Sequence, residues 1–388
     1  MKAINFFYHI NLDNQSAGGI INFLRGLIMD LEVSIPINYY SLQYTSDLEI
    51  NKDNFNEIFL KNMANNPNEK IKKSNNLVYM IELLKFFRQE KFSEEELLIF
   101  NRSDHALVAL IRRIKSKKIL IIHGSTKYDK FYYKHSLIKR VFSKVAEHIV
   151  IKNFDRIIAV SEEALEYYKS LYPRLTNKFE YIPTFVDQSV FKEKDYKHFN
   201  QQNELSFIYY GRFVEEKGIY HIKEFFDYLD VRKINYKALL IGEGELEKIF
   251  HGQDNVEIIN ALPQNEIVKY LHKKSILLMF SECEGTPLTL LESLATGTPA
   301  LCSNVGGMSK VIKNGKNGFL FEKVTQEYPI IAERAIEIFE NYSYYSYESV
   351  QSIKEYSLKQ VIIQYQNLIQ EFCSPKEVES EKSIQEKN

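Results

Sequence analysis

Short apolar runs alternate with longer helical stretches along most of this 388-residue chain, and this alternation limits the fold more than any other feature. The second half has six runs with the length and composition of buried strands, at 206–211, 236–242, 256–260, 276–280, 299–303 and 318–321. Strands separated by helices of this length are typical of a parallel sheet covered on both faces. The second half therefore predicts a doubly wound α/β domain.

The first half shows the same alternation less regularly. Its strand-like runs are 3–10, 37–44, 96–100, 118–124, 156–160 and 179–183. Residues 20–31 carry apolar positions on one helical face, so the chain opens with a strand, a loop and a helix. The polar, Asn- and Lys-rich residues 45–76 are expected to form a loop with some helix. The pattern predicts a second α/β domain.

The length and the pattern together indicate the domain organisation. At roughly 100–200 residues per domain, the chain is expected to hold two. We assign 1–186 to an N-terminal Rossmann-like domain, 205–345 to a C-terminal one and the polar segment 187–204 to the linker. Residues 346–372 are helical in pattern, and a return of these helices to the N-terminal domain is one alternative for their placement. The charged tail 373–388 predicts disorder.

The stretch after the fourth strand of the second half is the most informative. Thr286 is expected to cap a helix whose first position is Pro287 and which ends near Thr296. The amides of Leu288 and Thr289 would then be first-turn donors, and the helix dipole favours an anion there. The sequence therefore predicts an anion-binding helix start.

Two glutamates flank this helix start: Glu284 precedes it and Glu292 lies inside the helix. Carboxylates so placed can bind neutral hydroxyls on either side of a phosphate. An isolated pair at this spacing is more often a pair of solvated surface charges, so its interpretation depends on the neighbouring loops.

The loop after 206–211 supplies the context, because Arg212 and Lys217 bracket the start of another helix. Arg can bond two phosphate oxygens at once and Lys provides a point charge, so the two suit a diphosphate. Taken alone, beside Glu215 and Glu216, they would be a salt-bridged surface. Together with the anion-binding helix start they favour a ligand site.

In this order of motifs, the second half resembles the family 4 glycosyltransferases of the GT-B fold. The matching elements are GR-x4-KG at 211–218, GEGELEKI at 242–249, EGTPLTLLE at 284–292, ATGTPALCSNVGG at 295–307 and NGKNGFLF at 314–321. The first half matches less densely, through AGG at 17–19 and HG at 123–124. Where many relatives have Glu after the glycine pair of NVGGMSK, this chain has Lys310.

The resemblance implies two Rossmann-like domains that face each other across a cleft. It implies a nucleotide-sugar donor, which we expect to be UDP-linked, on the C-terminal domain and an acceptor on the N-terminal domain. Arg212 and Lys217 would bind the diphosphate and stabilise the departing nucleoside diphosphate, so we count both as catalytic. Glu292 would bind the ribose hydroxyls, and Glu284, also counted as catalytic, the hydroxyls of the donor sugar.

The donor would also be contacted by other parts of the two domains. Gly18 and Gly19 would let the backbone approach the phosphates, and the catalytic His123 would face the donor sugar near the reacting carbon. Around Glu284, the donor-binding stretch would include Thr286, Pro287, Leu288 and Thr289. An alternative for His123 is a buried histidine that bonds only to backbone.

The implied chemistry is glycosyl transfer through an oxocarbenium-like state. Cations and helix amides stabilise the charge that the leaving diphosphate gains. No cofactor and no metal are expected, since no DxD-type motif follows the matched strands. Members of the family retain the anomeric configuration, and we expect front-face displacement. The expected acceptor is a glycan or a lipid-linked molecule in surface polysaccharide or glycoconjugate biosynthesis.

A basic segment is hidden within the near-neutral total charge of −1. Residues 102–156 hold fourteen Lys and Arg against four Asp and Glu, a net +10, so the rest of the chain carries −11. Aromatic residues lie among the cations, which suggests contact with anionic lipid headgroups. The alternative is a solvated basic surface with Phe131, Tyr132 and Phe142 turned into the core. No nucleic-acid recognition motif accompanies the segment.

Two further readings stay open beside the transferase. A nucleotide-sugar epimerase of GT-B-like fold would need no acceptor, and a non-catalytic membrane-surface module would keep only the fold. The three cysteines form no CxxC pair, and the first residues lack the features of a signal peptide, so we expect a cytoplasmic protein. The basic segment adds peripheral attachment to the inner face of the cell membrane as an expectation.

Overall fold

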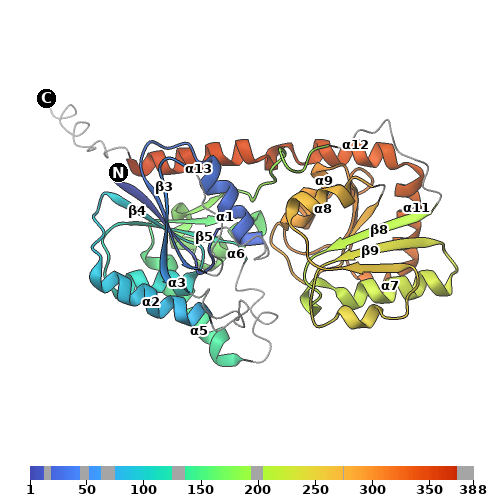
Figure 1. The fold of residues 1–388 in the computed structure, drawn as a ribbon, viewed down its shortest axis with the longest axis horizontal. Coiled ribbons are helices and arrows are strands. Elements are labelled where there is room, and N and C mark those ends of the chain that lie inside the picture. Colours follow the sequence, from blue (N-terminus) through green and yellow to red (C-terminus); the bar gives the residue numbers. More distant parts are fainter. Residues whose placement is uncertain are drawn as a thin grey trace.

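The computed structural model describes residues 1–12, 19–43, 52–62, 75–124, 136–193, 204–273 and 275–373. Within them, two parallel sheets lie side by side in two halves of the molecule, as Figure 1 shows. This arrangement confirms the predicted pair of doubly wound Rossmann-like domains. No helix in the described ranges is long and apolar enough to cross a bilayer.

The N-terminal half contains a sheet of seven described strands in the order β3-β2-β1-β4-β5-β6-β7, all parallel. Its elements are β1 (Ala3–Phe7), α1 (Gly19–Asp30), β2 (Ile37–Gln43), β3 (Phe55–Asn62), α2 (Asn75–Gln89), β4 (Glu96–Phe100), α3 (Ser103–Ile111), β5 (Lys117–Ile122), α5 (Leu137–Asn153), β6 (Arg156–Ala159), α6 (Glu162–Leu171) and β7 (Phe179–Tyr181). A short 3-10 helix, Pro173–Lys178, precedes β7.

The C-terminal half contains a sheet of six described strands in the order β10-β9-β8-β11-β12-β13, also all parallel. Its elements are β8 (Leu205–Tyr210), α7 (Ile219–Val231), β9 (Tyr236–Ile241), β10 (Val256–Ile259), α8 (Gln264–Leu271), β11 (Ile276–Met279), α9 (Leu288–Ala295), β12 (Ala300–Ser303), α10 (Met308–Val311), β13 (Gly318–Phe321), α11 (Tyr328–Glu340) and α12 (Tyr342–Ser352). The last helix of the chain is α13 (Leu358–Cys373).

Continuous apolar strands are buried on both faces of each sheet. In β4, Leu97 and Ile99 join the core that α1 covers, whereas Leu98 and Phe100 join the core beneath the helices of the other face. Strand β8 alternates in the same way between the two cores of the second sheet. A strand with side chains in two cores needs an apolar residue at every position, which is why these strands were visible in the sequence.

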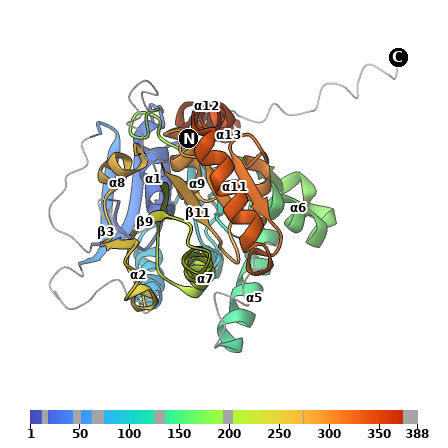
Figure 2. The ribbon, with the colours of Figure 1, turned by 90° about the vertical axis from the view of Figure 1, so that its right-hand side faces the viewer.

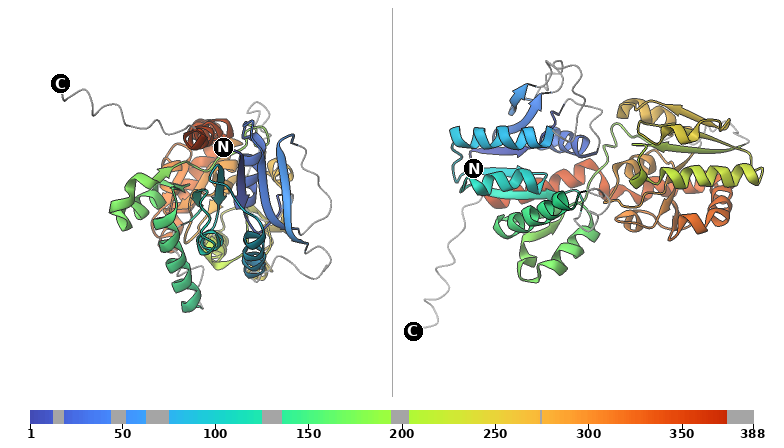
Figure 3. Two further views of the ribbon diagram at one scale, coloured as in Figure 1. Left: turned by 90° about the vertical axis from the view of Figure 1, so that its left-hand side faces the viewer. Right: turned by 90° about the horizontal axis from the view of Figure 1, so that it is seen from below.

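The last helices run along both halves (Figure 1). Helix α12 packs on α9, whereas α13 lies against α1 and buries Val361, Tyr365 and Leu368 in the N-terminal core. The backbone amide of Val186 donates to the Tyr356 carbonyl at 2.9 Å, so the two chain segments that join the halves lie side by side. The right view of Figure 3 again shows the two halves side by side, whereas Figure 2 and the left view of Figure 3 look along the long axis of the molecule from its two ends.

Three sequence-based expectations differ from the structure or lie outside it. The interpretation of 45–76 as loop with some helix is wrong for 55–62, which form the edge strand β3. This strand pairs with β2 on one side and is half exposed, so no continuous apolar run marks it. Residues 194–203 of the linker and 374–388 of the tail lie outside the described residues.

Candidate active site

One glycine holds the loop after β8 against the end of β11. Gly218 has a φ of 68°, and a Cβ there would lie 1.8 Å from the carbonyl oxygen of Phe280, so both the backbone and the space require glycine. The amide of Glu282 donates to the Glu216 carbonyl at 3.0 Å and joins the two loops further. These contacts bring Lys217 beside the loop that follows β11.

Lys217 and Glu284, 67 residues apart in the chain, form an ion pair with 2.6 Å between Nζ and Oε1. The Ser281 hydroxyl donates to the same Oε1 at 2.8 Å. Glu284 is buried, whereas Lys217 keeps about a quarter of its side chain exposed. In the described part of the chain Oε2 of Glu284 has no partner, so this oxygen is free to accept from a ligand hydroxyl.

Arg212 lies at the same strand end but on the surface. Its side chain is 65% exposed, and its Nη2 lies 3.3 Å from Oε1 of Glu216. The salt-bridged alternative therefore describes Arg212 in the unliganded protein. It does not describe Lys217, whose partner is Glu284.

The helix start at α9 differs by one residue from the expectation. Pro287, not Thr286, is the N-cap residue, with no side-chain cap, and the helix begins at Leu288. The extended backbone of Pro287 explains the shift, because its carbonyl is the first to accept a helical bond, from Leu290 at 3.1 Å. Within the described residues the amides of Leu288 and Thr289 have no backbone acceptor, as expected for first-turn donors.

Glu292 is buried inside α9 and is held by two side chains. The Gln264 amide donates to its Oε1 at 2.6 Å. The Tyr210 hydroxyl, which donates to the Thr289 carbonyl at 2.7 Å, also neighbours the carboxyl. Burial raises the pKa of Glu292 to about 7, and the two hydrogen-bonding neighbours oppose this. A carboxyl held in this way can accept hydrogen bonds from hydroxyl groups of a ligand.

The starts of α1 and α9 meet between the two halves. A Cβ on Gly19 would lie 3.5 Å from Cδ1 of Leu288, an ordinary contact. A Cβ on Gly285 would lie 3.0 Å from the backbone oxygen of His123. The N-terminal half therefore contributes Gly19 and His123 next to the first turn of α9. Gly18 lies outside the described residues.

His123 follows β5 and is partly buried beside Phe23, with 5.0 Å between ring centroids. Its Nε2 lies 2.9 Å from Oδ1 of Asn101, so in this orientation the ring donates to the amide oxygen. Burial lowers the pKa of His123 to about 3, which keeps the imidazole neutral. Its partner is thus a side chain, in contrast to the backbone-bonded alternative.

Lys310, the position where the sequence departs from the family pattern, forms an ion pair between the halves. Its Nζ lies 2.6 Å from Oε2 of Glu162 at the start of α6. The preceding loop packs on the Glu284 loop, since a Cβ on Gly306, with a φ of 59°, would lie 1.9 Å from the Glu284 carbonyl oxygen. The departure therefore supplies a contact between the two halves.

The structure also identifies residues that the motifs did not. Gln264 and Tyr210 hold Glu292, Asn101 holds His123, and Ser281 holds Glu284. Tyr210 ends β8, Asn101 follows β4 directly, Ser281 lies two residues after β11 and Gln264 begins α8, which places all four at the carboxyl edge of a sheet. Their position beside a strand end was the signal in the sequence that could have pointed to these four residues.

Two Rossmann-like halves with these groups at the carboxyl edges of their strands define a GT-B-type fold. In the described ranges no group of three or more His, Cys, Asp and Glu is arranged to hold a metal ion. The Glycosyltransferase Family 4 model matches residues 69–190, and the Glycosyl transferases group 1 model matches residues 190–360. The chain belongs to the family 4 glycosyltransferases.

Individual relatives agree with this assignment. An uncharacterized glycosyltransferase of Methanocaldococcus jannaschii is 26% identical over 336 residues, which cover 84% of this chain and 85% of the relative. The Escherichia coli UDP-Gal:alpha-D-GlcNAc-diphosphoundecaprenol alpha-1,3-galactosyltransferase is 26% identical over 45% of this chain and 46% of its own length. The crystal structure of Anabaena HepE in complex with UDP-glucose matches with a TM-score of 0.69 and 12% identity, over 96% of this chain and 100% of HepE.

Proposed function

We propose that the protein transfers a sugar from a UDP-sugar to a glycan or lipid-linked acceptor, with retention of the anomeric configuration. The product would be part of a surface polysaccharide or glycoconjugate. No cofactor or metal takes part in this proposal. The observation that carries it is the cluster around α9, where a free helix start lies between a buried carboxyl and a Lys–Glu pair.

The roles of the cluster follow from its chemistry. The ribose hydroxyls donate to the Glu292 carboxylate, which Gln264 and Tyr210 keep in place. The diphosphate accepts from the amides of Leu288 and Thr289, where the helix dipole also favours negative charge. A carboxylate that accepts from sugar hydroxyls and a positive helix end for phosphate thus lie one helical turn apart.

The reacting end of the donor lies beside the Lys217–Glu284 pair. Oε2 of Glu284 accepts from sugar hydroxyls, and the Lys217 ammonium moves toward the leaving phosphate as its charge grows. The bond between the anomeric carbon and the phosphate oxygen breaks, and its electron pair stays on UDP. The acceptor oxygen attacks from the same face, and its proton passes to the leaving phosphate oxygen. Exposed Arg212 can reach the diphosphate once it leaves Glu216.

Because its Nε2 donates to Asn101, the neutral His123 ring can accept from a hydroxyl of the donor sugar at Nδ1 without becoming charged. Gly19 and His123 come from the half that would hold the acceptor, so the acceptor and donor meet at this edge. The lipid-linked acceptor is supported by the E. coli relative, whose name contains a diphosphoundecaprenol-linked substrate. The UDP-linked donor is supported by that name and by the UDP-glucose complex of HepE.

Nucleotide binding is the first test. In thermal-shift measurements, UDP and UDP-sugars should raise the melting temperature more than GDP or ADP do. Lys217→Ala should reduce kcat/KM for the donor about 100-fold, as expected for a group that stabilises the leaving charge. The matched control is Lys316→Ala, which removes an exposed lysine of the same half.

Product analysis separates the alternatives. NMR of the product should show the anomeric configuration of the donor, and an inverted product would exclude front-face transfer. Conversion of the UDP-sugar to its epimer without any acceptor would identify an epimerase. The absence of any nucleotide binding in the native protein would favour a non-catalytic module.

A further inference from the structure

Helix α5 presents an apolar face to solvent. Its other face packs against α3 and buries Ala146, Val150 and Ile151. The solvent face carries large apolar side chains that are between 38% and 84% exposed. They are Leu137, Ile138, Val141, Phe142, Val145 and Ile149. The alternative in which Phe142 turns into the core is therefore wrong, while Phe131 and Tyr132 lie outside the described residues.

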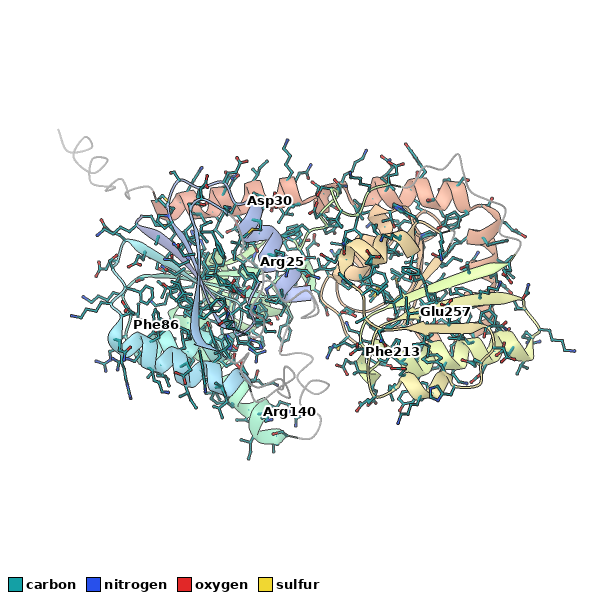
Figure 4. The ribbon with its side chains drawn as sticks, viewed as in Figure 1. Arg25, Asp30, Phe86, Arg140, Phe213 and Glu257 are labelled. Carbon is teal, nitrogen blue, oxygen red and sulfur yellow. The ribbon has the colours of Figure 1, made fainter. Side chains whose placement is uncertain are left out.

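These six side chains form one continuous stripe. At 3.6 residues per turn they fall within an arc of about 140°. The first turns of α5 project beyond the other helices of the N-terminal half in Figures 1 and 2 and in the left view of Figure 3, and Figure 4 shows Arg140 near that projecting end. The stripe is therefore not part of a core that a neighbouring element completes within the described chain.

The charge on the solvent-facing part of α5 has one sign. Lys139, Lys144 and Lys152 are exposed, and Arg140 is partly exposed. The one carboxylate of the helix, Glu147, is buried and accepts from the Tyr168 hydroxyl at 2.7 Å. An apolar stripe with cations on the same helix, and no exposed acid, is complementary to an anionic lipid surface.

A second copy of the chain fits this surface less well. In a symmetric dimer through α5, the lysines and Arg140 of two helices would meet at close range without carboxylates between them. Anionic headgroups neutralise the cations while the acyl region takes the apolar side chains, and long lysines extend from one layer to the other. Charge complementarity therefore favours a membrane.

We propose that the exposed stripe of α5, at residues 137–149, inserts into the interface of an anionic bilayer and holds the protein there. The inference extends the proposed function, because a helix after a parallel strand begins at the carboxyl end of that strand. The projecting start of α5 consequently lies at the same sheet edge as His123, which follows β5. A bound bilayer would lie near the acceptor side, where a lipid-linked acceptor enters.

Vesicle sedimentation with the full chain tests the proposal. The native protein should bind vesicles with about 30% phosphatidylglycerol and should not bind pure phosphatidylcholine. The double variant I138D/V141D should reduce the partition coefficient at least about tenfold, and K139E/K144E should do so on the anionic vesicles. The control Val231→Asp changes an apolar residue that is 80% exposed on α7, and it should bind like the native protein.

Vesicle binding is interpreted together with thermal melting, the UDP-induced shift and the oligomeric state. Thermal melting and the UDP-induced shift should be unchanged in I138D/V141D, which shows that the fold and the donor site are intact. The proposal is overturned if the native protein does not bind anionic vesicles. It is also overturned if I138D/V141D binds them as tightly as the native protein does. A native dimer that the double variant converts to a monomer, without vesicle binding, would assign the stripe to a second copy. Failure of UDP binding in every variant would instead count against the proposed function.

Discussion

The buried carboxyl of Glu292 should reduce the stability of the unliganded protein at alkaline pH. Its pKa of about 7 lies above the ordinary value of 4.5 because the site excludes water. Between these two values the folded state binds the proton more tightly than the unfolded state, so the free energy of unfolding falls as pH rises. At about 1.4 kcal/mol for each tenfold change in proton affinity, the full cost is about 3 kcal/mol.

The Glu292→Gln variant removes this ionisation and keeps the size of the side chain. It should be more stable than the native protein by about 3 kcal/mol near pH 8 and by about 1 kcal/mol near pH 5. For a domain of this size the difference near pH 8 corresponds to about 6–12 °C in melting temperature. The same variant should bind UDP about tenfold more weakly, because an amide accepts through only one oxygen.

Thermal unfolding at the two pH values, with calorimetric titration of UDP, measures both effects. The matched control is Glu257→Gln, at an exposed position on the edge strand β10 that Figure 4 labels, and its stability should match the native protein at both pH values. A Glu292→Gln variant that is no more stable near pH 8, or equally stabilised at both pH values, would refute the burial argument. A stabilised variant with native UDP affinity would refute the assigned role in binding.

Two substitutions test the loops around the site. In urea unfolding, Gly218→Ala should destabilise the protein by more than about 2 kcal/mol, because the new Cβ collides with Phe280 in addition to straining the left-handed backbone. The control Gly252→Ala also has a positive φ, of 89°, but open space around it, so it should cost only about 1 kcal/mol. Equal losses would show that the collision relaxes. Lys310→Glu should cost less than about 1 kcal/mol in urea unfolding, because the pair with Glu162 is half exposed, and the charge swap with Glu162→Lys should restore native stability. A swapped protein that stays less stable than the native one would show that Lys310 has a role beyond this pair.

The positions of the strands and helices could be predicted only in part from the sequence. Strands such as β4 are buried on both faces, so an uninterrupted apolar run marks them. The edge strand β3 pairs on one side and keeps polar residues, so it was interpreted as loop. The start of α9 was placed one residue early, because Thr286 and Pro287 both fit a helix start and only the backbone conformation distinguishes them.

The candidate site also contains residues that the sequence identified and contacts that only the structure shows. Glu284, Glu292 and Lys217 stand in recognisable motifs, and their order along the chain was enough to select them. The pairing of each site residue with its hydrogen-bond partner was not accessible, since Gln264 reaches Glu292 from a helix 28 residues away and His123 meets Asn101 from the neighbouring strand. Such pairs depend on the register and order of strands, which no local pattern contains.

By itself, the sequence determined the class of fold, the chain order of most strands and helices, and the motif residues, because these depend on interactions among residues close together in the chain. Tertiary structure decided which charges meet. Lys217 has acidic neighbours at Glu215 and Glu216 but pairs with Glu284, since Gly218 lets its loop pack against the end of β11. Tertiary structure also decided that the apolar stripe of α5 faces solvent, because α3 covers only the opposite side of that helix.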